Sequence, residues 1–405
     1  MTETAQNGVR RALVLSGGGA RGAYEAGVLS YIFERVLPLC SPGSEFDIAS
    51  GTSVGAIHAT YATATRGVSG PERAKTLLEA WETMRLSEML QLRPADLWRV
   101  PLRMLGLRTR SAPSGRTLGG LVDVSRLEDL VTGHIPWQQL HGNLDGHPLA
   151  LCVSCTEVRS GQVVVFMSGD LAETGPWAFD PNSRAVKTPI EPIHVRASAA
   201  IPFLFPAVRI GERYFVDGGL RMNTPLSPAL RLGADRVFVV CLRHPPAVDS
   251  ERPAYPESAI TSPSFLLGKV MNALTLDQLE YDLKRLELVN DMITHGEAVY
   301  GADFLDRMNV AVRSQRGANY RRVAAEALRP SEDLGALAAD CFERDADSMG
   351  GVARWLGRYT IQDGGREADL LSYLLFDRCY TRRLIELGRS DAELRADAIR
   401  EILET

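Results

Sequence analysis

The chain has 405 residues, a length that suits two domains or one large domain with an appendage. Apolar residues make up 45% and charged residues 23% of it, which is the composition of a globular protein with a substantial core. The formal net charge of −5 argues against a nucleic-acid-binding protein, because that class usually carries a basic surplus.

From residue 12 to residue 245, short apolar runs alternate with longer helix-like stretches. The apolar runs predict strands over Ala12–Ser16, Phe46–Ser50, Leu149–Val158, Gln162–Met167, Arg213–Val216 and Arg236–Leu242. The intervening stretches predict helices over Gly22–Leu37, over Ser53–Thr65, and after Thr224 as N-cap with Pro225 in the first helical position. This alternation predicts an α/β fold with a mainly parallel central sheet.

The pattern changes after residue 245. Residues 246–264 are rich in proline and polar residues and predict a linker. The remainder, 265–405, is mostly helical in pattern, with long helices over Leu266–Ile293 and over Asp369–Leu387, the latter stopped by Gly388. This region carries no chemical motif, and we expect its apolar stripes to pack in a core or to join copies in a homo-oligomer.

Six cysteines are scattered along the chain. Cys152 and Cys155 have the spacing of a metal or redox pair, but they fall in a predicted strand, where residues three apart point to opposite faces. We interpret them as core cysteines, which suits a reducing, cytoplasmic compartment. No group of acids, histidines or cysteines has ligand spacing, so we expect no metal and no other cofactor. No stretch approaches the length of a spanning helix, and the apolar run that starts at Ala12 is too short for a signal peptide.

The first motif, Ser16–Gly22, is rich in glycine and lies between a predicted strand and a predicted helix. Its glycines, Gly17, Gly19 and Gly22, satisfy the dinucleotide fingerprint, but the second strand ends in Ser50–Ser53 rather than in an acid for the ribose. A tight turn without a ligand is a second interpretation. A third is that the glycines expose backbone N–H groups at a helix N-terminus, where they can bind an oxyanion.

The second motif, Gly51-Thr52-Ser53-Val54-Gly55, directly follows a strand and precedes a helix. A nucleophile on such an elbow needs small neighbours two residues away on either side, and the two glycines meet that need. The third motif, Asp217-Gly218-Gly219, would by itself indicate a hairpin turn. It becomes evidence for a catalytic site because it follows the other two motifs in the chain.

None of the seven histidines has the setting of a catalytic base. His58 lies on the same predicted helix as Ser53, so its ring should point away from the serine. A dyad, in which a carboxylate contacts the serine directly, therefore fits the sequence better than a triad with histidine. An aspartate of ordinary pKa, about 3.9, is a weak base, so such a site must be desolvated and needs a strong oxyanion hole.

These three motifs, in this order, resemble those of the patatin-like phospholipases. Two further stretches match the family: Arg196–Pro202 followed by Pro206, and Asn223-Thr224-Pro225. The resemblance covers roughly residues 12–243, and it implies a three-layer α/β/α catalytic domain, over residues 12–245, with a Ser–Asp dyad. By this resemblance Ser53 is the nucleophile and Asp217 the base. The implied oxyanion loop comprises Gly17, Gly18, Gly19, Arg21 and Gly22, and the supporting motif residues are Gly51, Gly55, Gly218, Gly219 and Pro202.

The resemblance implies a serine acyl-ester hydrolase that acts on phospholipids or lysophospholipids through an acyl-serine intermediate. A lipid acyltransferase with the same dyad remains an alternative, because the two differ in the access of water to the acyl-enzyme. A nucleotide-binding regulatory module that uses the glycine loop is a rival from another class.

A basic, apolar segment at residues 85–116 is the expected site of lipid contact. It holds seven arginines against two acids, interleaved with Trp, Leu and Met, as in segments that lie on anionic membranes. The alternative is an amphipathic helix that packs on the domain with its arginines in water. We therefore expect a cytoplasmic protein with peripheral membrane contact.

Overall fold

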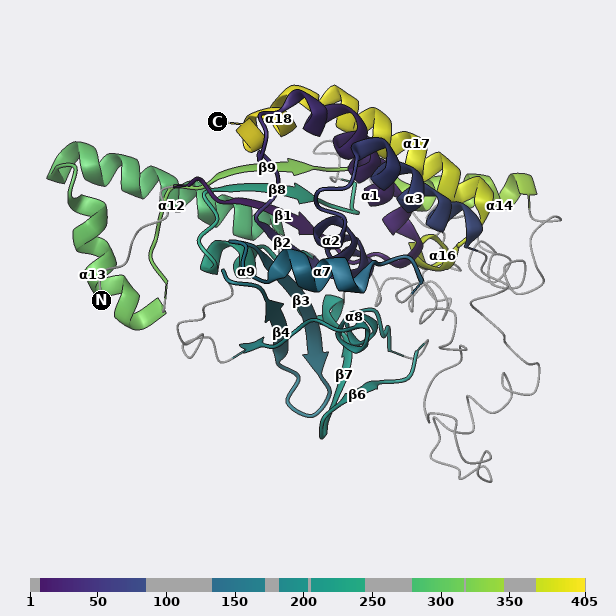
Figure 1. Cartoon of the computed structure of the whole chain (residues 1–405), viewed down its shortest axis with the longest axis horizontal. Helices are drawn as coiled ribbons and strands as arrows, with labels where there is room; N and C mark the ends of the chain where they lie inside the picture. Colours follow the sequence, from purple (N-terminus) through teal and green to yellow (C-terminus); the bar gives the residue numbers. More distant parts are fainter. Residues whose placement is uncertain are drawn as a thin grey trace, which may run out of the picture.

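The computed structural model describes residues 8–84, 133–171, 182–202, 205–244, 279–316, 318–345 and 369–404. Nine strands within these residues form one sheet, in the order β5-β4-β3-β2-β1-β8-β9, with β7 paired to β3 and β6 paired to β7 (Figure 1). The strands are β1 (Arg11–Leu15), β2 (Ile48–Thr52), β3 (Ala150–Glu157), β4 (Val163–Ser168), β5 (Ser183–Lys187), β6 (Val208–Ile210), β7 (Arg213–Asp217), β8 (Arg236–Val240) and β9 (Ala324–Leu328).

The centre of the sheet is parallel. Strands β3, β2, β1, β8 and β9 all pair in parallel, whereas β4 and β7 both join β3 antiparallel. The prediction of a mainly parallel sheet is therefore confirmed. The central strands read as continuous apolar runs because helices cover both of their faces.

Helices pack on both faces of the sheet. One face carries α1 (Gly22–Tyr31), α2 (Val54–Ala64), α3 (Gly70–Thr83) and α17 (Arg378–Leu394), of which α1, α3 and α17 lie side by side (Figure 1). The other face carries α9 (Leu226–Arg231) and α12 (Leu279–Tyr300). The remaining helices that the argument uses are α7 (Trp137–Leu144), α8 (Pro192–Ser198), α13 (Phe304–Arg316), α14 (Leu334–Asp345), α16 (Asp369–Leu374) and α18 (Ala396–Glu404). This three-layer arrangement confirms the predicted fold class.

The two neighbouring cysteines of β3 point to opposite faces of the sheet, as predicted. Cys152 packs in the core on the side of α9 and α12, and Cys155 packs in the core on the side of α1 and α17. Both are fully buried free thiols. Burial raises the pKa of each thiol, so neither is suited to bind a metal as a thiolate.

The C-terminal region shares the sheet and the core of the preceding residues. Strand β9 pairs with β8, and α17 packs along α1. The predicted single helix over Asp369–Leu387 is wrong, because the chain breaks into α16 and α17 around residues 375–377. There the Asp377 side chain accepts a hydrogen bond from the Cys379 amide (2.9 Å) and caps α17.

Gly388 does not stop a helix, contrary to the sequence prediction. It lies inside α17, where a Cβ would come within 2.2 Å of the Tyr24 carbonyl oxygen of α1. On the facing helix, a Cβ at Gly27 would come within 2.3 Å of the Ile385 carbonyl oxygen. The two glycines therefore let the backbones of α1 and α17 approach closely.

Other predicted features differ in their limits or lie outside the described residues. The helix after Thr224 begins at Leu226, one residue later than predicted, with Pro225 in the N-cap position. The Thr224 hydroxyl instead hydrogen-bonds to Ser16 Oγ (2.5 Å).

Three predicted features fall outside the described residues: the linker over 246–264, the first part of the predicted Leu266–Ile293 helix, and the segment 85–116. In the ranges that are described, no helix combines the length and the apolar character needed to cross a bilayer.

We expect Gly388→Ala to lower the free energy of unfolding by about 1–3 kcal/mol, because its methyl group would overpack the contact between α17 and α1. Chemical denaturation measures this change. The matched control is Gly142→Ala in α7, where a Cβ meets nothing within 4 Å. There alanine should be neutral or stabilise the helix by up to about 1 kcal/mol. Equal stability of the two variants would contradict the close helix contact.

Candidate active site

Strand β3 brings the second and third sequence motifs together. Along one edge its first five residues, Ala150–Ser154, pair with β2, and its last three, Cys155–Glu157, pair with β7. The opposite edge is occupied by β4. Strand β7 therefore takes over the same edge at the point where β2 ends. Ser53 follows β2 directly and Asp217 is the last residue of β7, so the two meet end to end.

Ser53 occupies a strained backbone position. Its φ and ψ are 56° and −125°, and it is the only residue other than glycine with positive φ in the part of the chain that is described. It stands at the N-terminus of α2, and its amide donates to Ser198 Oγ (2.9 Å). Gly51 makes the sharp turn feasible, since a Cβ there would lie 2.1 Å from the Gly55 carbonyl oxygen. The second motif thus forms the predicted elbow.

Asp217 is a buried carboxylate with one open acceptor. Its Oδ1 accepts a hydrogen bond from the Gly219 amide (2.7 Å), while its Oδ2 is buried and accepts none. Burial raises the pKa of Asp217 to about 6, while the Ser53 hydroxyl and the Gly219 amide act to lower it. Oδ2 is the carboxylate oxygen that accepts no hydrogen bond from the described residues.

The glycine loop lies against the elbow. A Cβ at Gly17 would lie 3.1 Å from the Cβ of Ser53. Three of the five predicted oxyanion-loop amides already have acceptors: that of Gly17 donates to the Asn223 carbonyl (3.0 Å), that of Arg21 to the Gly18 carbonyl (3.1 Å), and that of Gly22 to the Ala20 and Gly19 carbonyls. The amides of Gly18 and Gly19 donate to none of the described residues.

The side chain of Arg21 ties the glycine loop to the C-terminal region. Its Nε donates to Ser372 Oγ (2.8 Å), and its guanidinium carbon lies 4.1 Å from the centre of the Tyr373 ring. The Tyr373 carbonyl also abuts the loop, since a Cβ at Gly19 (φ +56°) would lie 2.4 Å from that oxygen. Helix α16 therefore contacts the loop at both Arg21 and Gly19. No local sequence pattern indicated this contact.

His58 is held in a buried network that excludes it from the dyad. Its Nδ1 lies 2.8 Å from Glu25 Oε2, and its Nε2 accepts a hydrogen bond from the Trp81 indole (3.0 Å). Burial lowers the pKa of His58 to about 3, so the ring is neutral and both nitrogens are engaged. The ring joins α1, α2 and α3. The histidine side chains that hydrogen-bond within the described ranges do so to groups other than Ser53 and Asp217.

Two residues at the site were not singled out from the sequence. Ser198 Oγ accepts from the Ser53 amide and donates to the Ser154 carbonyl (2.7 Å), so it links the elbow to β3. Asn223 holds Gly17 through its carbonyl. Both belong to the supporting stretches, Arg196–Pro202 and Asn223–Pro225, where the family resemblance was the available signal.

The supporting residues have packing roles. A Cβ at Gly218 would lie 2.3 Å from the Ser154 carbonyl oxygen, so glycine lets the turn after β7 lie against β3. Pro202 lies in the turn that follows α8. Among the residues with described positions, no cluster of histidine, cysteine or acidic side chains could hold a metal ion.

We expect Asp217→Asn to stabilise the fold. Because the folded pKa of Asp217 is raised above its unfolded value, ionisation of the carboxylate disfavours folding once the pH rises through both values. Asparagine should therefore raise the free energy of unfolding by about 2–3 kcal/mol above about pH 6, and the gain should shrink as the pH falls toward about 4. Denaturant unfolding of both proteins across this pH range measures it. A gain that does not depend on pH would show that Asp217 is not a desolvated carboxylate.

The solved structures that are similar to this chain include those of two proteins of low sequence identity. VipD from Legionella pneumophila is 13% identical, with 94% of this chain and 67% of that chain covered and a TM-score of 0.31. Two structures of human GIVD cytosolic phospholipase A2 in complex with methyl gamma-linolenyl fluorophosphonate, one also with terbium chloride, are 12% and 14% identical. They cover 98% of this chain and 58% and 59% of those chains, each with a TM-score of 0.40. The chain thus spans about three fifths of the length of the phospholipase structures.

No curated protein matches the chain. The family model described as patatin-like phospholipase matches residues 13–230, which is more than half of the sequence and includes all three motifs. The chain belongs to the patatin-like phospholipase family.

Proposed function

We propose that this lipid acyl hydrolase cleaves phospholipids or lysophospholipids through an acyl-serine intermediate on Ser53, with Asp217 as the base. The observation that supports the proposal is the strand pairing along β3, where β7 follows on from β2, so that Asp217, with its Oδ2 unpaired, lies at the end of β2 that leads into Ser53. Positive φ at a lone serine is a form of strain that proteins keep mainly at functional sites.

In the proposed first step, Ser53 Oγ attacks the ester carbonyl carbon while Asp217 Oδ2 accepts the hydroxyl proton. The oxyanion that forms accepts hydrogen bonds from the Gly18 and Gly19 amides. Collapse of this intermediate breaks the ester C–O bond, and the proton passes from Asp217 to the leaving alkoxide. Water then attacks the acyl-serine, Asp217 again accepts the proton, and the fatty acid is released as the Ser53 hydroxyl is restored.

Burial of Asp217 supports its role as a base without histidine. With a pKa of about 6 it stays ionised near neutral pH, yet it is a stronger base than an exposed aspartate. The oxyanion hole supplies the rest of the stabilisation, since one such donor contributes about 3–4 kcal/mol in serine hydrolases.

Two alternatives remain with different support. An acyltransferase would use the same residues but pass the acyl group to an acceptor other than water. A dinucleotide-binding module has less support, because the Gly17 amide is already bonded to Asn223 and Tyr373 packs on Gly19. Product analysis with and without added alcohol separates hydrolysis from transfer, and binding of a dinucleotide would favour the module.

We expect a fluorophosphonate probe to label the wild-type chain and to leave Ser53→Ala unlabelled. Asp217→Asn should be labelled at least about a hundredfold more slowly, because general-base catalysis contributes roughly 10²–10⁴-fold. Mass spectrometry of the intact protein measures both. The control is Ser390→Ala, an exposed serine of α17, which should be labelled at the wild-type rate. Labelling that persists in Ser53→Ala would end the assignment.

We expect kcat/KM for an uncharged short-chain ester to fall about tenfold per pH unit below about pH 6 and to level off above it. The reason is that Asp217 must be ionised to accept the serine proton, and burial raises its pKa to about 6. A profile that stays flat from about pH 5 to pH 8 would contradict this role for the carboxylate.

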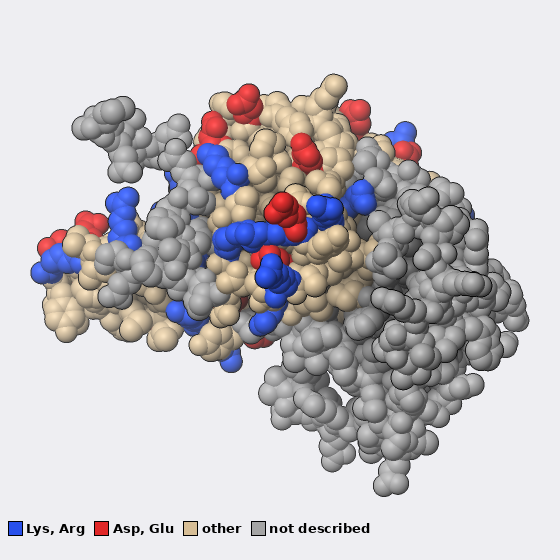
Figure 2. Space-filling view, turned by 90° about the horizontal axis from the view of Figure 1, so that it is seen from below, with Lys and Arg blue, Asp and Glu red and all other residues tan. Residues whose placement is uncertain are grey.

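Contact with an anionic lipid surface remains part of the proposal. The segment 85–116, on which the sequence prediction rests, lies outside the described residues. Lys and Arg side chains gather on the described face seen from below, with acidic side chains among them (Figure 2). Exposed basic residues also occur on β5, β6 and β7, at Lys187, Arg209 and Arg213. These charges are compatible with approach to an anionic membrane.

We expect reversal of the arginine charges in residues 85–116 to weaken binding to anionic vesicles while sparing hydrolysis of a short soluble ester. The reason is that basic residues near a membrane each contribute about 1 kcal/mol of attraction to anionic lipid. Vesicle co-sedimentation and an esterase assay measure the two effects. Equal loss in both assays would indicate that the segment packs on the domain instead.

The predicted homo-oligomer also remains a proposal, which light scattering of the purified chain would test. Its support is an exposed apolar stripe on α12, formed by residues at helical spacing: Tyr281, Leu288, Met292 and Val299.

A further inference from the structure

A buried polar network lies one helical turn from the contact between the glycine loop and the elbow. Gly22, the last residue of the loop motif, makes this contact with Val54, the residue after Ser53, because a Cβ at Gly22 would collide with the Val54 side chain. Glu25 lies three residues after Gly22 on α1. His58 lies four residues after Val54 on α2. Residues at these spacings share a face of a helix, so Glu25 and His58 meet in the next layer of the packing.

The network joins three helices through Glu25 of α1, His58 of α2 and Trp81 of α3, each at most 2% exposed. The Trp81 indole N–H can only donate, so His58 Nε2, at 3.0 Å, is its acceptor and carries no hydrogen. The hydrogen of the neutral ring is therefore on Nδ1, which donates it to Glu25 Oε2 (2.8 Å). The chemistry of the three groups thus fixes the direction of both hydrogen bonds.

Trp81 spans both layers of this packing. Besides its bond to His58, its Cζ2 atom would lie 3.0 Å from a Cβ at Gly22. The elbow also touches the start of the loop motif, since a Cβ at Gly55 would lie 2.7 Å from the Ser16 carbonyl oxygen. Apolar contacts of this kind are non-directional, whereas the hydrogen bonds one turn away hold only within a narrow range of distance and angle.

The Glu25 carboxyl is costly to keep in this position. Its Oε1 is buried and accepts no hydrogen bond from the described residues, and burial raises the pKa of the carboxyl well above its ordinary value. A well-packed apolar side chain would avoid this cost. Ionisable groups that are desolvated in this way, close to a reaction centre, are typical of functional sites.

We propose that Glu25 and His58 are positioning residues for the oxyanion hole: their hydrogen bond, supported by Trp81, sets the distance between the glycine loop and Ser53. Neither residue touches the substrate. The inference rests on the proposed function of Ser53. A displacement of the loop amides should slow the chemical step more than it weakens substrate binding, because the oxyanion is present only after the serine attacks.

The test compares two substitutions of Glu25 in the full chain, with kcat and KM measured on an uncharged short-chain ester. Glu25→Met removes the acceptor with a side chain of similar length. It should lower kcat about ten- to a hundredfold and change KM by less than about threefold. Glu25→Gln keeps an oxygen that can accept from His58 Nδ1, so it should retain at least about a third of the wild-type kcat.

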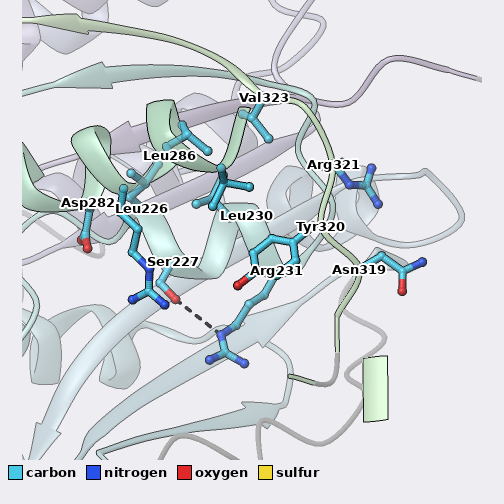
Figure 3. Close-up of a pocket in the computed structure, with 12 residues that line it drawn as sticks. Leu226, Ser227, Leu230, Arg231, Asp282, Leu286, Asn319, Tyr320, Arg321 and Val323 are labelled. Carbon is cyan, nitrogen blue, oxygen red and sulfur yellow. Dashed lines mark hydrogen bonds between the residues drawn. The ribbon is translucent and has the colours of Figure 1, made fainter. Parts of the chain in front are cut away.

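Two controls separate position from stability. Tyr61→Phe removes another buried hydrogen bond of α2, the one from the Tyr61 hydroxyl to the Arg73 carbonyl (2.7 Å). Leu286→Ala shortens a buried side chain of α12 beside a cavity on the other face of the sheet (Figure 3). Both should lower the unfolding temperature and leave kcat and KM at their wild-type values.

Trp81→Phe is the milder second variant, which replaces Glu25→Met if that protein does not fold. Phenylalanine keeps an aromatic ring in the packing but removes the N–H that His58 Nε2 accepts. It should lower kcat about threefold or more, again with little change in KM.

Wild-type kcat in Glu25→Met, or in Trp81→Phe where the first variant does not fold, would overturn the proposal. So would a Glu25→Gln protein as slow as Glu25→Met, or an equal loss of kcat in the two controls. Fluorophosphonate labelling keeps this result apart from a failure of the proposed function. A wild-type chain that is not labelled at Ser53 removes the nucleophile itself, whereas a labelled chain whose Glu25 variants keep full activity removes only the positioning role.

Discussion

The candidate site depends on the unequal length of two neighbouring strands. Strand β3 extends beyond β2, and its unpaired backbone groups would otherwise be left without partners in a buried place. Strand β7 satisfies them from the opposite direction, and its last residue is Asp217. The same backbone pairing that completes the sheet therefore delivers a carboxylate to the end of β2, where the elbow presents Ser53.

The packing of this region accounts for the basicity of Asp217. Asp217 has a raised pKa because it is buried, and it is buried because the end of β7 pairs with β3 inside the sheet. The glycine loop is also contacted by α16, through Arg21 and Tyr373. The C-terminal region therefore contacts the glycine loop, which itself packs against Ser53 at Gly17.

Much of this was accessible from the sequence, for physical reasons. The strands β1, β2 and β8 begin in short apolar runs, so their limits were predicted to within two residues. The elbow was predictable because its backbone tolerates only small neighbours at Gly51 and Gly55. What sequence alone could not decide was whether Asp217-Gly218 is a hairpin turn or a site, since that depends on which edge of β3 remains open.

The errors also have physical causes. Gly388 was predicted to end a helix because glycine often does so. Here its lack of a side chain instead allows the close contact with the backbone of Tyr24 in α1. The break between α16 and α17 interrupts apolar residues at helical spacing. The N-cap of α17, Asp377, is by itself a weak sequence indication of a helix start. Ser198 and Ser372 act through hydrogen bonds to residues distant in sequence, and no spacing rule connects them to their partners.

The most direct test of the central claim is a crystal structure of the chain after reaction with a fluorophosphonate. We expect the phosphorus on Ser53 Oγ, one phosphonyl oxygen within about 2.7–3.1 Å of the Gly18 and Gly19 amides, and Asp217 Oδ2 beside Oγ. An adduct whose oxygen faces away from the glycine loop, or a carboxylate of Asp217 turned away from the serine, would contradict the account.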